Sequence, residues 1–355
     1  MGTTLSKLFY REKTITGIDI GQTAIKMMSL DTKRGEVVCF GSVDIDPERM
    51  QAAIKDGDSA FIVDTLTDLL RNKVIGTFGS KKVVVSIPAS QVFTRTLALP
   101  LKAERALKSA VELEAEQYIP VPVSSLIIDY QVIGRTDTEL SVLMCAAPRK
   151  VVTMVTEATE RLGLEAVAIE PSMMAVGRLL TATENAGLPS IIVDIGAVVT
   201  DIAAVDNNSI RVTGSAPIGG NIFTLNIAKS LNTSLEQAHQ MKVLYGLSYS
   251  TRQKKLTKAL APDLDTILSE VKKLIRYYND RLGGEKLEQL LIVGSGANIP
   301  GIGEYFTNTL MMAARVADPW QKINFGHLSP PARQVKPRYI TVAGAASVTQ
   351  EELWK

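Results

Sequence analysis

The chain has 355 residues, too many for one ordinary core and suited to two lobes of about 100–200 residues each. A hydrophobic content of 46% favours large cores and excludes a disordered chain. The 39 Lys and Arg residues almost balance the 37 Asp and Glu residues, so no nucleic-acid partner is expected. Cys39 and Cys145 lie in apolar stretches, and with only two histidines in the chain they predict buried free thiols, not a zinc site.

The N-terminal segment carries weak signals. No apolar segment follows the N-terminus, so no secretory signal is expected. Residues 1–6 fit the loose N-myristoylation pattern, whereas the apolar side chains of residues 5–10 favour a small helix that docks on the body or on a partner. A membrane-spanning helix needs about 20 apolar residues. The most apolar window, residues 188–205, carries Asp194 and Asp201 and therefore predicts a pair of buried strands.

Two segments share one pattern. Residues 14–30 and residues 189–205 each predict a strand, a tight glycine turn and a return strand. A third strand is expected after each copy, near residues 37–43 and 210–216. The copies are about 175 residues apart, which indicates a duplicated domain and not a solenoid.

Between the copies the pattern alternates strands and helices. Strands are expected at residues 82–87, 93–99, 126–133, 140–147 and 166–169, with helices at 101–118 and 151–162. Pro120 and Pro122 end the first of these helices. The β-α-β-β-α-β order from about residue 93 to about residue 165 predicts a small subdomain inserted into the first lobe.

The segment after the second copy is richer in helix. Ser234 and Gln237 form a capping box for a helix that ends near Gly246. A long amphipathic helix is expected from about Pro262 to Leu282, ended by two glycines. A strand at residues 287–293, a glycine-rich turn and a last helix beginning near residue 341 follow.

The first Asp-x-Gly turn predicts a phosphate and metal site. Gly21 gives a tight turn its backbone freedom and lets several N–H groups point at one place, as a phosphate requires. Asp19 lies at the end of a buried strand. Burying its carboxylate costs free energy unless the charge meets a cation such as Mg²⁺. Gln22 and Thr23 in the loop, with Lys26 on the return strand, are candidate nucleotide contacts. A plain hairpin with a solvated aspartate is the alternative.

The second Asp-x-Gly turn favours the site over the hairpin. Asp194 supplies a second metal-side carboxylate, and Gly196 and Ala197 supply the matching turn. Thr200 and Asp201 begin the return strand, where a hydroxyl can reach a phosphate. Two such turns facing each other predict a clamp on a triphosphate.

A third glycine turn follows the strand at residues 287–293. It consists of Gly294, Ser295, Gly296 and Ala297, whose backbone offers a flat surface for an adenine or a ribose. The dinucleotide motif Gly-x-Gly-x-x-Gly is not met, because the next glycine is Gly301.

In this order the three turns resemble the phosphate-1, phosphate-2 and adenosine motifs of the actin-like ATPase superfamily. The resemblance implies an α/β, actin-like (ribonuclease H-like) fold of two lobes that binds ATP or ADP with Mg²⁺. Glu170, in a Glu-Pro pair, resembles the glutamate that places the attacking water in that superfamily and is the candidate catalytic residue. Gly219 and Gly220 resemble the turn that leads into the second lobe's helix.

Within the superfamily the chain resembles the PilM family of type IV pilus assembly proteins. The similar stretches are residues 86–100, 112–120, 129–131 and 238–247. The resemblance implies a first lobe at residues 1–187, with subdomain 1A and an inserted FtsA-type subdomain 1C at about 93–165. The second lobe is then residues 188–355, with subdomain 2A and an inserted subdomain 2B at about 235–285.

Two departures bear on catalysis. Where the family has a glutamate that contacts the nucleoside sugar together with Lys242, this chain has His239, which is not an anion at neutral pH. The second loop also has the apolar Val198 and Val199 where hydroxyls are common. Both changes indicate a nucleotide that is held structurally or hydrolysed slowly.

The resemblance also implies a function. It predicts a cytoplasmic scaffold, peripheral to the inner membrane through a PilN-like partner whose N-terminal peptide lies in a groove between subdomains 1A and 1C. PilO, PilP and the motor ATPases PilB and PilT are indirect partners, and self-association is possible. The alternative is a filament-forming division or shape protein like FtsA or MreB, but the chain ends soon after its last expected helix, without the separate C-terminal anchor of FtsA. A metabolic kinase lacks a supporting motif.

Overall fold

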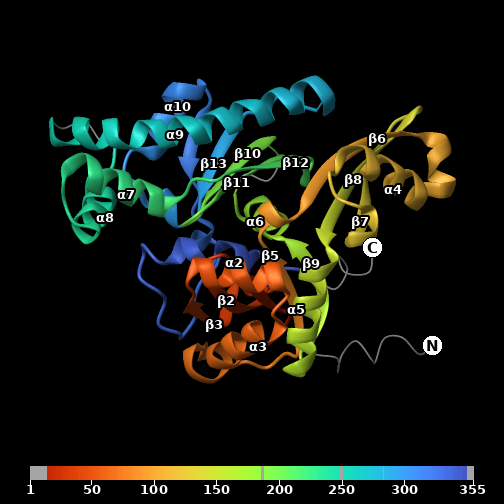
Figure 1. Cartoon of the computed structure of the whole chain (residues 1–355), viewed down its shortest axis with the longest axis horizontal. Helices are drawn as coiled ribbons and strands as arrows, with labels where there is room; N and C mark the ends of the chain where they lie inside the picture. Colours follow the sequence, from red (N-terminus) through yellow and green to blue (C-terminus); the bar gives the residue numbers. More distant parts are fainter. Residues whose placement is uncertain (1–13, 185–187, 248–250, 283, 350–355) are drawn as a thin grey trace.

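The computed structural model describes residues 14–184, 188–247, 251–282 and 284–349 (Figure 1). The helix expected at residues 5–10 lies outside the described residues. Two β-sheets with helices around them form the body, and a smaller unit projects from one side (Figure 1). No helix within the described ranges is long and apolar enough to cross a membrane.

The first sheet has the order β4-β3-β2-β1-β5-β9. Its strands are β1 (Thr16–Ile20), β2 (Ala24–Asp31), β3 (Glu36–Asp44), β4 (Ile75–Gly76), β5 (Lys82–Ile87) and β9 (Glu165–Pro171). The helices packed on it are α2 (Pro47–Asp56), α3 (Ser59–Asp68), continued by the π-helical turn η1 (Leu69–Lys73), and α5 (Arg149–Arg161). We call this sheet with its helices the first lobe.

The second sheet has the order β14-β13-β10-β11-β12-β6-β8-β7. Its strands are β6 (Phe93–Pro100), β7 (Leu126–Arg135), β8 (Glu139–Pro148), β10 (Ser190–Ile195), β11 (Thr200–Asp206), β12 (Ser209–Ala216), β13 (Gln289–Val293) and β14 (Ala313–Val316). The helices on its β10–β14 part are α7 (Gly220–Leu231), α8 (Leu235–Leu244), α9 (Thr251–Tyr277) with the π-helical turn η5 (Tyr278–Leu282), and α10 (Ile302–Leu310). Strands β10–β14 with these helices are the second lobe.

The two lobes share one strand order. In the first lobe β1, β2 and β3 are antiparallel, and β5 and β9 follow on the other side of β1 in parallel. In the second lobe β10, β11 and β12 are antiparallel, and β13 and β14 are parallel to β10. The duplication expected from the sequence is thus confirmed, and it places the first and second glycine turns at equivalent ends of β1 and β10.

Two helices fill the space between the sheets. They are α6 (Ser172–Thr183) and α11 (Ile340–Ala346), and their side chains share one hydrophobic core with strands of both sheets. Helix α11 packs on β1, β2 and β5, so the end of the expected second lobe lies on the first sheet. Gly344 permits the helices to cross closely, because a Cβ there would collide with the backbone of Ala175.

The projecting part, which we call the inserted unit, consists of β6, α4 (Leu107–Tyr118), β7 and β8. It has a hydrophobic core of its own. The helix expected at residues 101–118 is divided into the 3₁₀ turn η3 (Leu101–Ala106) and α4. Helix α5, which falls within the range expected for the subdomain, packs its apolar stripe in the first-lobe core instead. We therefore propose that the inserted unit ends at Pro148.

Helix α9 differs from its expected start. It begins eleven positions before Pro262, at Thr251, and Pro262 lies within it. The expected start was wrong because the buried stripe continues upstream through Leu256 and Leu260, and this burial outweighs the hydrogen bond that Pro262 cannot donate. The cap of α8 is confirmed, since the Ser234 hydroxyl accepts a hydrogen bond from the Gln237 N–H.

Short 3₁₀ turns complete the structure. They are η2 (Ala89–Gln91), η4 (Val123–Ser125), η6 (Ser295–Asn298), η7 (Pro319–Gln321) and η8 (Lys336–Tyr339).

Candidate functional site

The loops after β1, β10 and β13 line one cavity between the two sheets, which we call the central cavity. The sequence-predicted residues that line it are Asp19, Gly21, Gln22, Thr23, Lys26, Asp194, Gly196, Ala197, Gly294 and Ser295. The lining also includes Pro88, Ser172, Asp201, Arg338 and Thr341. The structure therefore brings most of the residues of the three turns to one place.

The first two turns are built alike. The Gly21 N–H donates to the Ala24 carbonyl at 3.0 Å, and the Gly196 N–H donates to the Val199 carbonyl at 3.0 Å. The third turn needs glycine for a different reason. Gly294 has a φ of 86°, and a Cβ at this position would collide with the carboxylate of Asp194. Because glycine has no Cβ atom, the third turn can lie directly against the second.

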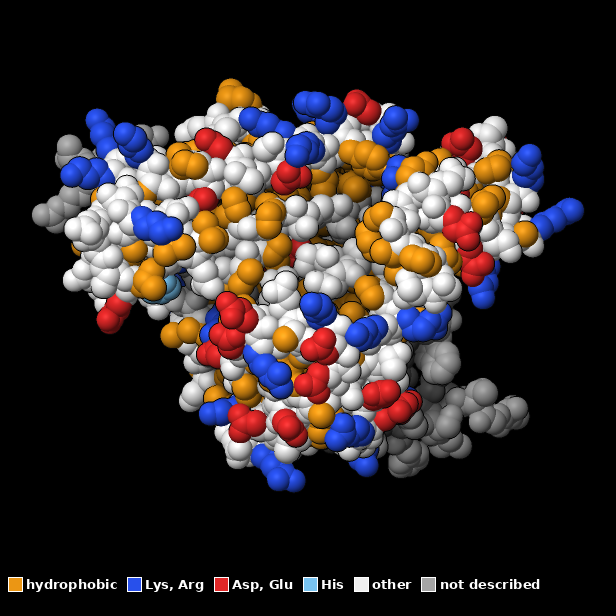
Figure 2. Space-filling model, in the orientation of Figure 1, with side chains coloured by type: hydrophobic (Ala, Val, Ile, Leu, Met, Phe, Trp, Pro, Cys, Tyr) orange, Lys and Arg blue, Asp and Glu red, His pale blue; other side chains and the backbone are white. Residues whose placement is uncertain are grey.

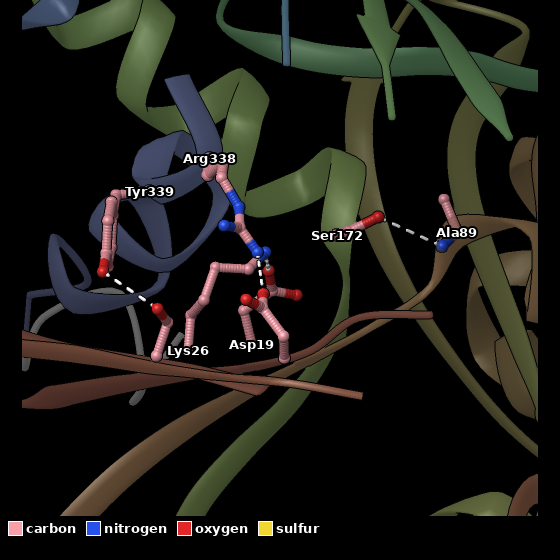
Figure 3. Close-up of polar contacts among 8 residues, drawn as sticks. Asp19, Lys26, Ala89, Ser172, Arg338 and Tyr339 are labelled. Carbon is pink, nitrogen blue, oxygen red and sulfur yellow. Dashed lines mark hydrogen bonds and ion pairs between the residues drawn. The ribbon is translucent and has the colours of Figure 1, made fainter. Parts of the chain in front are cut away.

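The carboxylate of the first turn is already paired. Asp19 and Lys26 are cross-strand neighbours on β1 and β2, and the Lys26 ammonium donates to Asp19 Oδ2 (Figure 3). Arg338 reaches from η8 toward Asp19 and Lys26 (Figure 3). Its guanidinium pairs with Asp44 at the end of β3. This side of the cavity thus carries two cations, each paired with a carboxylate, and an anionic ligand would share them with Asp19 and Asp44.

The carboxylates of the second turn have no ion-pair partner in the part of the chain that the structure describes. Asp194 and Asp201 face each other on β10 and β11. Burial, only partly offset by Lys26, raises the pKa of Asp194 to about 6, and burial with the charges of Asp194 and Asp19 raises the pKa of Asp201 to about 7. Asp201 Oδ1 is buried and has no hydrogen-bond partner among the described residues. Buried carboxylates of this kind fit a cation, and a hard divalent cation such as Mg²⁺ suits their oxygens.

No group of three or more His, Cys, Asp or Glu side chains in the described part of the chain forms a ready metal site. Mg²⁺ is commonly held by one or two carboxylates together with phosphate and water oxygens. Asp19, Asp194 and the unpredicted Asp201 are the residues here that would contribute.

Several predicted residues lie behind the cavity wall. The Thr200 hydroxyl, expected to reach a phosphate, donates to the Ile218 carbonyl at 2.7 Å. Gly219 and Gly220 support the second turn, because the N–H of Gly220 donates to the Gly196 carbonyl. Gly296 packs closely on Ile195, and Ala297 is buried outside the cavity lining.

His239 and Lys242 of α8 also lie outside the lining. The Lys242 ammonium donates to the Gly220 carbonyl at 2.7 Å and to the Thr224 hydroxyl at 2.8 Å. Burial lowers the pKa of Lys242 to about 8, and burial and the neighbouring Lys242 lower the pKa of His239, which is exposed. In this arrangement Lys242 holds the start of α7 through Gly220 and Thr224, and His239 lies exposed on α8.

Glu170, the predicted catalytic residue, is not brought to the cavity lining. Its two carboxylate oxygens accept hydrogen bonds from Arg178 at 2.5 and 2.9 Å, and Arg178 also donates to the Gly344 carbonyl. A water would have to compete with the Arg178 guanidinium for both carboxylate oxygens of Glu170. The contacts assign Glu170 a role in fastening α6 and α11 to β9.

Glu170→Gln is therefore expected to lower the free energy of unfolding by about 1–3 kcal/mol, because it weakens the two charge-assisted hydrogen bonds that join Glu170 to Arg178. Nucleotide affinity and ATP turnover per folded molecule are expected to stay within about twofold of the native values. Urea denaturation and calorimetric titration measure the two quantities. Glu165→Gln, at an exposed position of the same strand, is the matched control. Loss of turnover without loss of stability would restore the catalytic role.

Sequence reasoning missed several residues of the lining. The sequence pattern places Asp201 only at the start of the return strand. The pairing of β10 with β11 sets it directly opposite Asp194. Ser172, in the first turn of α6, follows the Glu-Pro pair and is the one of these that the sequence signals. Arg338 and Thr341 come from far along the chain, and no local pattern points to them.

A family model described as type IV pilus assembly protein PilM matches residues 17–347. The chain belongs to the PilM family. The fold agrees, since a solved PilM–PilN type IV pilus biogenesis complex is similar over 94% of this chain and 98% of that chain, with a TM-score of 0.72 and 22% identity. MreB 5 of Spiroplasma citri bound to AMPPNP is similar over 94% of this chain and 95% of that chain, with a TM-score of 0.52 and 14% identity. The fold of this PilM family member is actin-like.

A curated relative is similar over a shorter part of the chain. The cell division protein FtsA of Neisseria meningitidis serogroup B is 31% identical over 157 residues, which are 41% of this chain and 37% of FtsA. The chain thus spans well under half of that relative's length.

Proposed function

We propose that this PilM family member is a nucleotide-binding scaffold of type IV pilus assembly. It binds ATP or ADP with Mg²⁺ in the central cavity and a PilN-like N-terminal peptide in a groove on its side. The observation that carries the proposal is the meeting of two Asp-x-Gly turns at one cavity in a chain that the PilM model matches over residues 17–347.

The central cavity suits a polyphosphate. Its first turn offers backbone N–H groups, Lys26 of β2 and Arg338 of η8 line it, and the start of α6 lies at Ser172. Helix N-termini and cationic side chains both favour anions. Asp194 and Asp201 lie on the opposite turn, where a magnesium ion bound to the phosphates would supply their missing positive charge. The MreB neighbour, solved with AMPPNP, supports a nucleotide ligand for this fold.

Catalysis is proposed to be slow. A water positioned for attack needs a base within hydrogen-bond reach, and Glu170 is held by Arg178. Val198 and Val199 add no hydroxyl to the cavity lining, and Thr200 directs its own to a backbone carbonyl. A protein that binds ATP but hydrolyses it slowly fits the role of a scaffold whose conformation depends on whether ATP or ADP is bound.

A second hollow, which we call the side groove, has a volume of about 680 Å³. It lies where the inserted unit meets the two lobes, and Figure 2 shows hydrophobic side chains gathered beside this hollow. Its walls come from η2 and β6, from the end of α4, and from β12; they include Phe93, Arg95, Tyr118, Ile119 and Gly214. An apolar groove with exposed aromatic side chains suits an extended peptide.

The partner proposed for the side groove is the N-terminal segment of a PilN-like membrane protein. The solved PilM–PilN complex supports this choice for the family. Such a partner would hold the chain at the cytoplasmic face of the inner membrane and connect it to PilO and PilP, and through them to the motor ATPases PilB and PilT.

Phe93→Glu tests the groove directly. Phe93 is 38% exposed at the start of β6 and lines the groove, so a carboxylate there is expected to weaken binding of a synthetic PilN N-terminal peptide at least about tenfold. Fluorescence anisotropy gives the dissociation constant. Ile75→Glu is the matched control, because Ile75 is an exposed strand residue outside the groove. If both variants and the native protein bound the peptide with equal affinity, the proposal that the peptide binds in this groove would be wrong.

The likeness to FtsA supports the alternative, a filament-forming division protein. Sedimentation with ATP and Mg²⁺ discriminates between the two functions. Pelleting of the protein alone without any affinity for a PilN peptide would favour the filament.

A further inference from the structure

Helix α9 carries basic side chains along the outer edge of the second lobe. It lies on the side of the molecule opposite α3, and its buried stripe packs on β11 and β12 (Figure 1). The rest of the helix surface is exposed, and Figure 2 shows Lys and Arg side chains gathered along this edge. We call this exposed side the basic face. Its cations are Lys254, Lys255, Lys258, Lys272, Lys273 and Arg276.

Four of these cations lie in one line. An α-helix turns about 100° per residue, so residues that are 4, 14 or 18 positions apart point within about 40° of one another. Lys254, Lys258, Lys272 and Arg276 have these spacings. At a rise of 1.5 Å per residue the line is about 33 Å long. A line of this length at the outer edge of the molecule can meet a flat surface over its whole extent.

The protein itself leaves most of this charge without a counter-ion. Lys273 pairs with Glu270 at 2.7 Å, and none of the other five cations has an ion-pair partner among the described residues. Asp265 and Asp280 are the other carboxylates on this side of α9. Six cations and three carboxylates give the basic face a net charge of +3, whereas the formal charge of the whole chain is +2. The remainder of the chain therefore sums to a slightly negative charge.

A hollow beside the first turns of α9 adds a place for an anionic group. It has a volume of about 550 Å³ and lies between α9 and α10. Lys254 and Lys258 line it from α9. Asn308 and Thr309 line it from α10, and Glu304 is the acidic residue of the lining. Two ammonium groups with neutral hydrogen-bond donors beside them suit the phosphate diester of a lipid head group.

An exposed apolar side chain lies close to this hollow. Met311 caps the C-terminus of α10, two residues after Thr309, and is 89% exposed. Apolar side chains beside basic ones are typical of surfaces that lie in a membrane interface, where the apolar groups enter the head-group region and the cations attract anionic lipids. A purely electrostatic contact with a nucleic acid or an acidic protein does not require the methionine.

The basic face also lies beside the side groove. Near the C-terminal end of α9, the centre of the Tyr277 ring is 5.4 Å from the guanidinium of Arg95, which lines the groove. A membrane protein whose N-terminal peptide occupied the groove would therefore bring the bilayer near this end of α9. The basic face itself needs no such partner.

From these features we propose that the basic face of α9 binds the anionic surface of a membrane directly. Head-group phosphates lie at Lys254 and Lys258, and the side chain of Met311 enters the lipid surface. The inference goes beyond the proposed function, because this membrane contact does not depend on a PilN-like protein. Each basic residue near an anionic membrane strengthens binding by about fivefold, so the cations of the face together suffice for a reversible attachment.

Vesicle flotation of the full chain, without partner protein or nucleotide, tests the proposal. The vesicles are phosphatidylcholine alone, or phosphatidylcholine with about one-third phosphatidylglycerol. We expect the protein to bind the mixed vesicles at least about tenfold more tightly than the neutral ones and to dissociate as salt is added, because salt screens exposed charges. Absence of binding, or equal binding to both kinds of vesicle, would overturn the proposal.

A charge-reversed variant locates the contact. The variant combines Lys254→Glu, Lys258→Glu and Lys272→Glu, all at exposed positions of the line. Its affinity for the mixed vesicles is expected to fall at least about tenfold, because three cations become anions. Native affinity in this variant would show that the basic face does not bind the vesicles.

The matched control has the same change in net charge elsewhere. It combines Lys81→Glu, Lys102→Glu and Lys108→Glu, at exposed positions of the first lobe and the inserted unit. Its affinity for the mixed vesicles is expected to stay within about threefold of native, because these lysines lie outside α9. An equal loss of affinity in both variants would mean that overall charge causes the binding, and the proposed face would be wrong.

Met311→Ser distinguishes a lipid surface from another polyanion. Loss of the apolar side chain is expected to weaken binding to the mixed vesicles about twofold or more, with no change in the net charge. Because Met311 is exposed, this variant also tests the proposal if the charge-reversed variant fails to fold. Native affinity for duplex DNA equal to or tighter than that for the mixed vesicles at the same salt would make the partner a nucleic acid and overturn the lipid assignment.

Discussion

Replacing Asp201 with asparagine is expected to make the ligand-free protein more stable above pH 7 and to weaken its binding of Mg²⁺-nucleotide. Asp201 is buried beside Asp194, and one of its carboxylate oxygens has no hydrogen-bond partner within the described ranges. Asparagine has the same shape without the charge. The variant therefore separates two effects of the carboxylate: its destabilisation of the ligand-free fold and its contribution to the affinity for Mg²⁺-nucleotide.

The pH dependence follows from the raised pKa. The folded pKa of Asp201 is about 7, against an ordinary value of 3.8, so the unfolded chain loses this proton more readily than the folded protein. The penalty is absent below about pH 4, grows as the pH rises toward 7 and is complete above it. The stability difference between Asp201→Asn and the native protein is thus expected to be near zero at pH 4 and about 2–4 kcal/mol in favour of the variant at pH 8.

Urea denaturation in EDTA across this pH range gives the stability difference, and calorimetric titration of AMPPNP with Mg²⁺ at pH 8 gives the affinity. The affinity is expected to fall about 10–100-fold, as for other changes to carboxylates near a metal. Asp64→Asn, at an exposed position of α3, is the matched control and is expected to change neither quantity. A native pH profile in the Asp201→Asn protein would show that this carboxylate carries no penalty.

Gly344→Ala is expected to destabilise the protein by about 3 kcal/mol. In α11 this glycine faces α6, where an added methyl group would collide with the carbonyl of Ala175. The neighbour is backbone and cannot rotate away, so the two central helices must separate. The same change would disturb the Gly344 carbonyl that accepts from Arg178, and with it the site between the lobes.

Gly177→Ala in α6 is the matched control. A Cβ at Gly177 would meet Ile210 at 3.5 Å, which is ordinary contact, and alanine favours a helix over glycine. This variant is expected to be neutral or more stable by up to about 1 kcal/mol. Urea denaturation of both proteins checks the pair. Equal stabilities would mean that the helix crossing tolerates the methyl group and that α6 and α11 are less closely held than their contacts indicate.

Local sequence patterns were sufficient to predict the two Asp-x-Gly turns that line the central cavity. Asp19 and Gly21, and later Asp194 and Gly196, repeat one strand-turn-strand pattern, and the fold places both turns at the central cavity. Such patterns are readable because a tight turn between buried strands restricts the residue types that fit it. The capping of α8 by Ser234 was readable for the same reason.

Contacts between segments far apart in the chain could not be predicted from local sequence patterns. The pairing of Glu170 with Arg178 depends on how α6 folds back on β9, and no local pattern around Glu170 predicts it. Thr200 and Asp201 are adjacent in the chain, but one turns to the Ile218 carbonyl and the other to the cavity. Which of two neighbours faces a ligand is set by strand register, which depends on the partner strand.

The sequence by itself determined the duplicated two-lobed architecture, the two Asp-x-Gly turns and membership of the PilM family, because each is written in local residue patterns along most of the chain. Only the tertiary structure decided that Asp201 is an uncompensated buried carboxylate, that Arg338 supplies a cation, and that η2 separates two cavities. These features arise from burial and from contacts between segments far apart in sequence, and both exist only after the chain has folded.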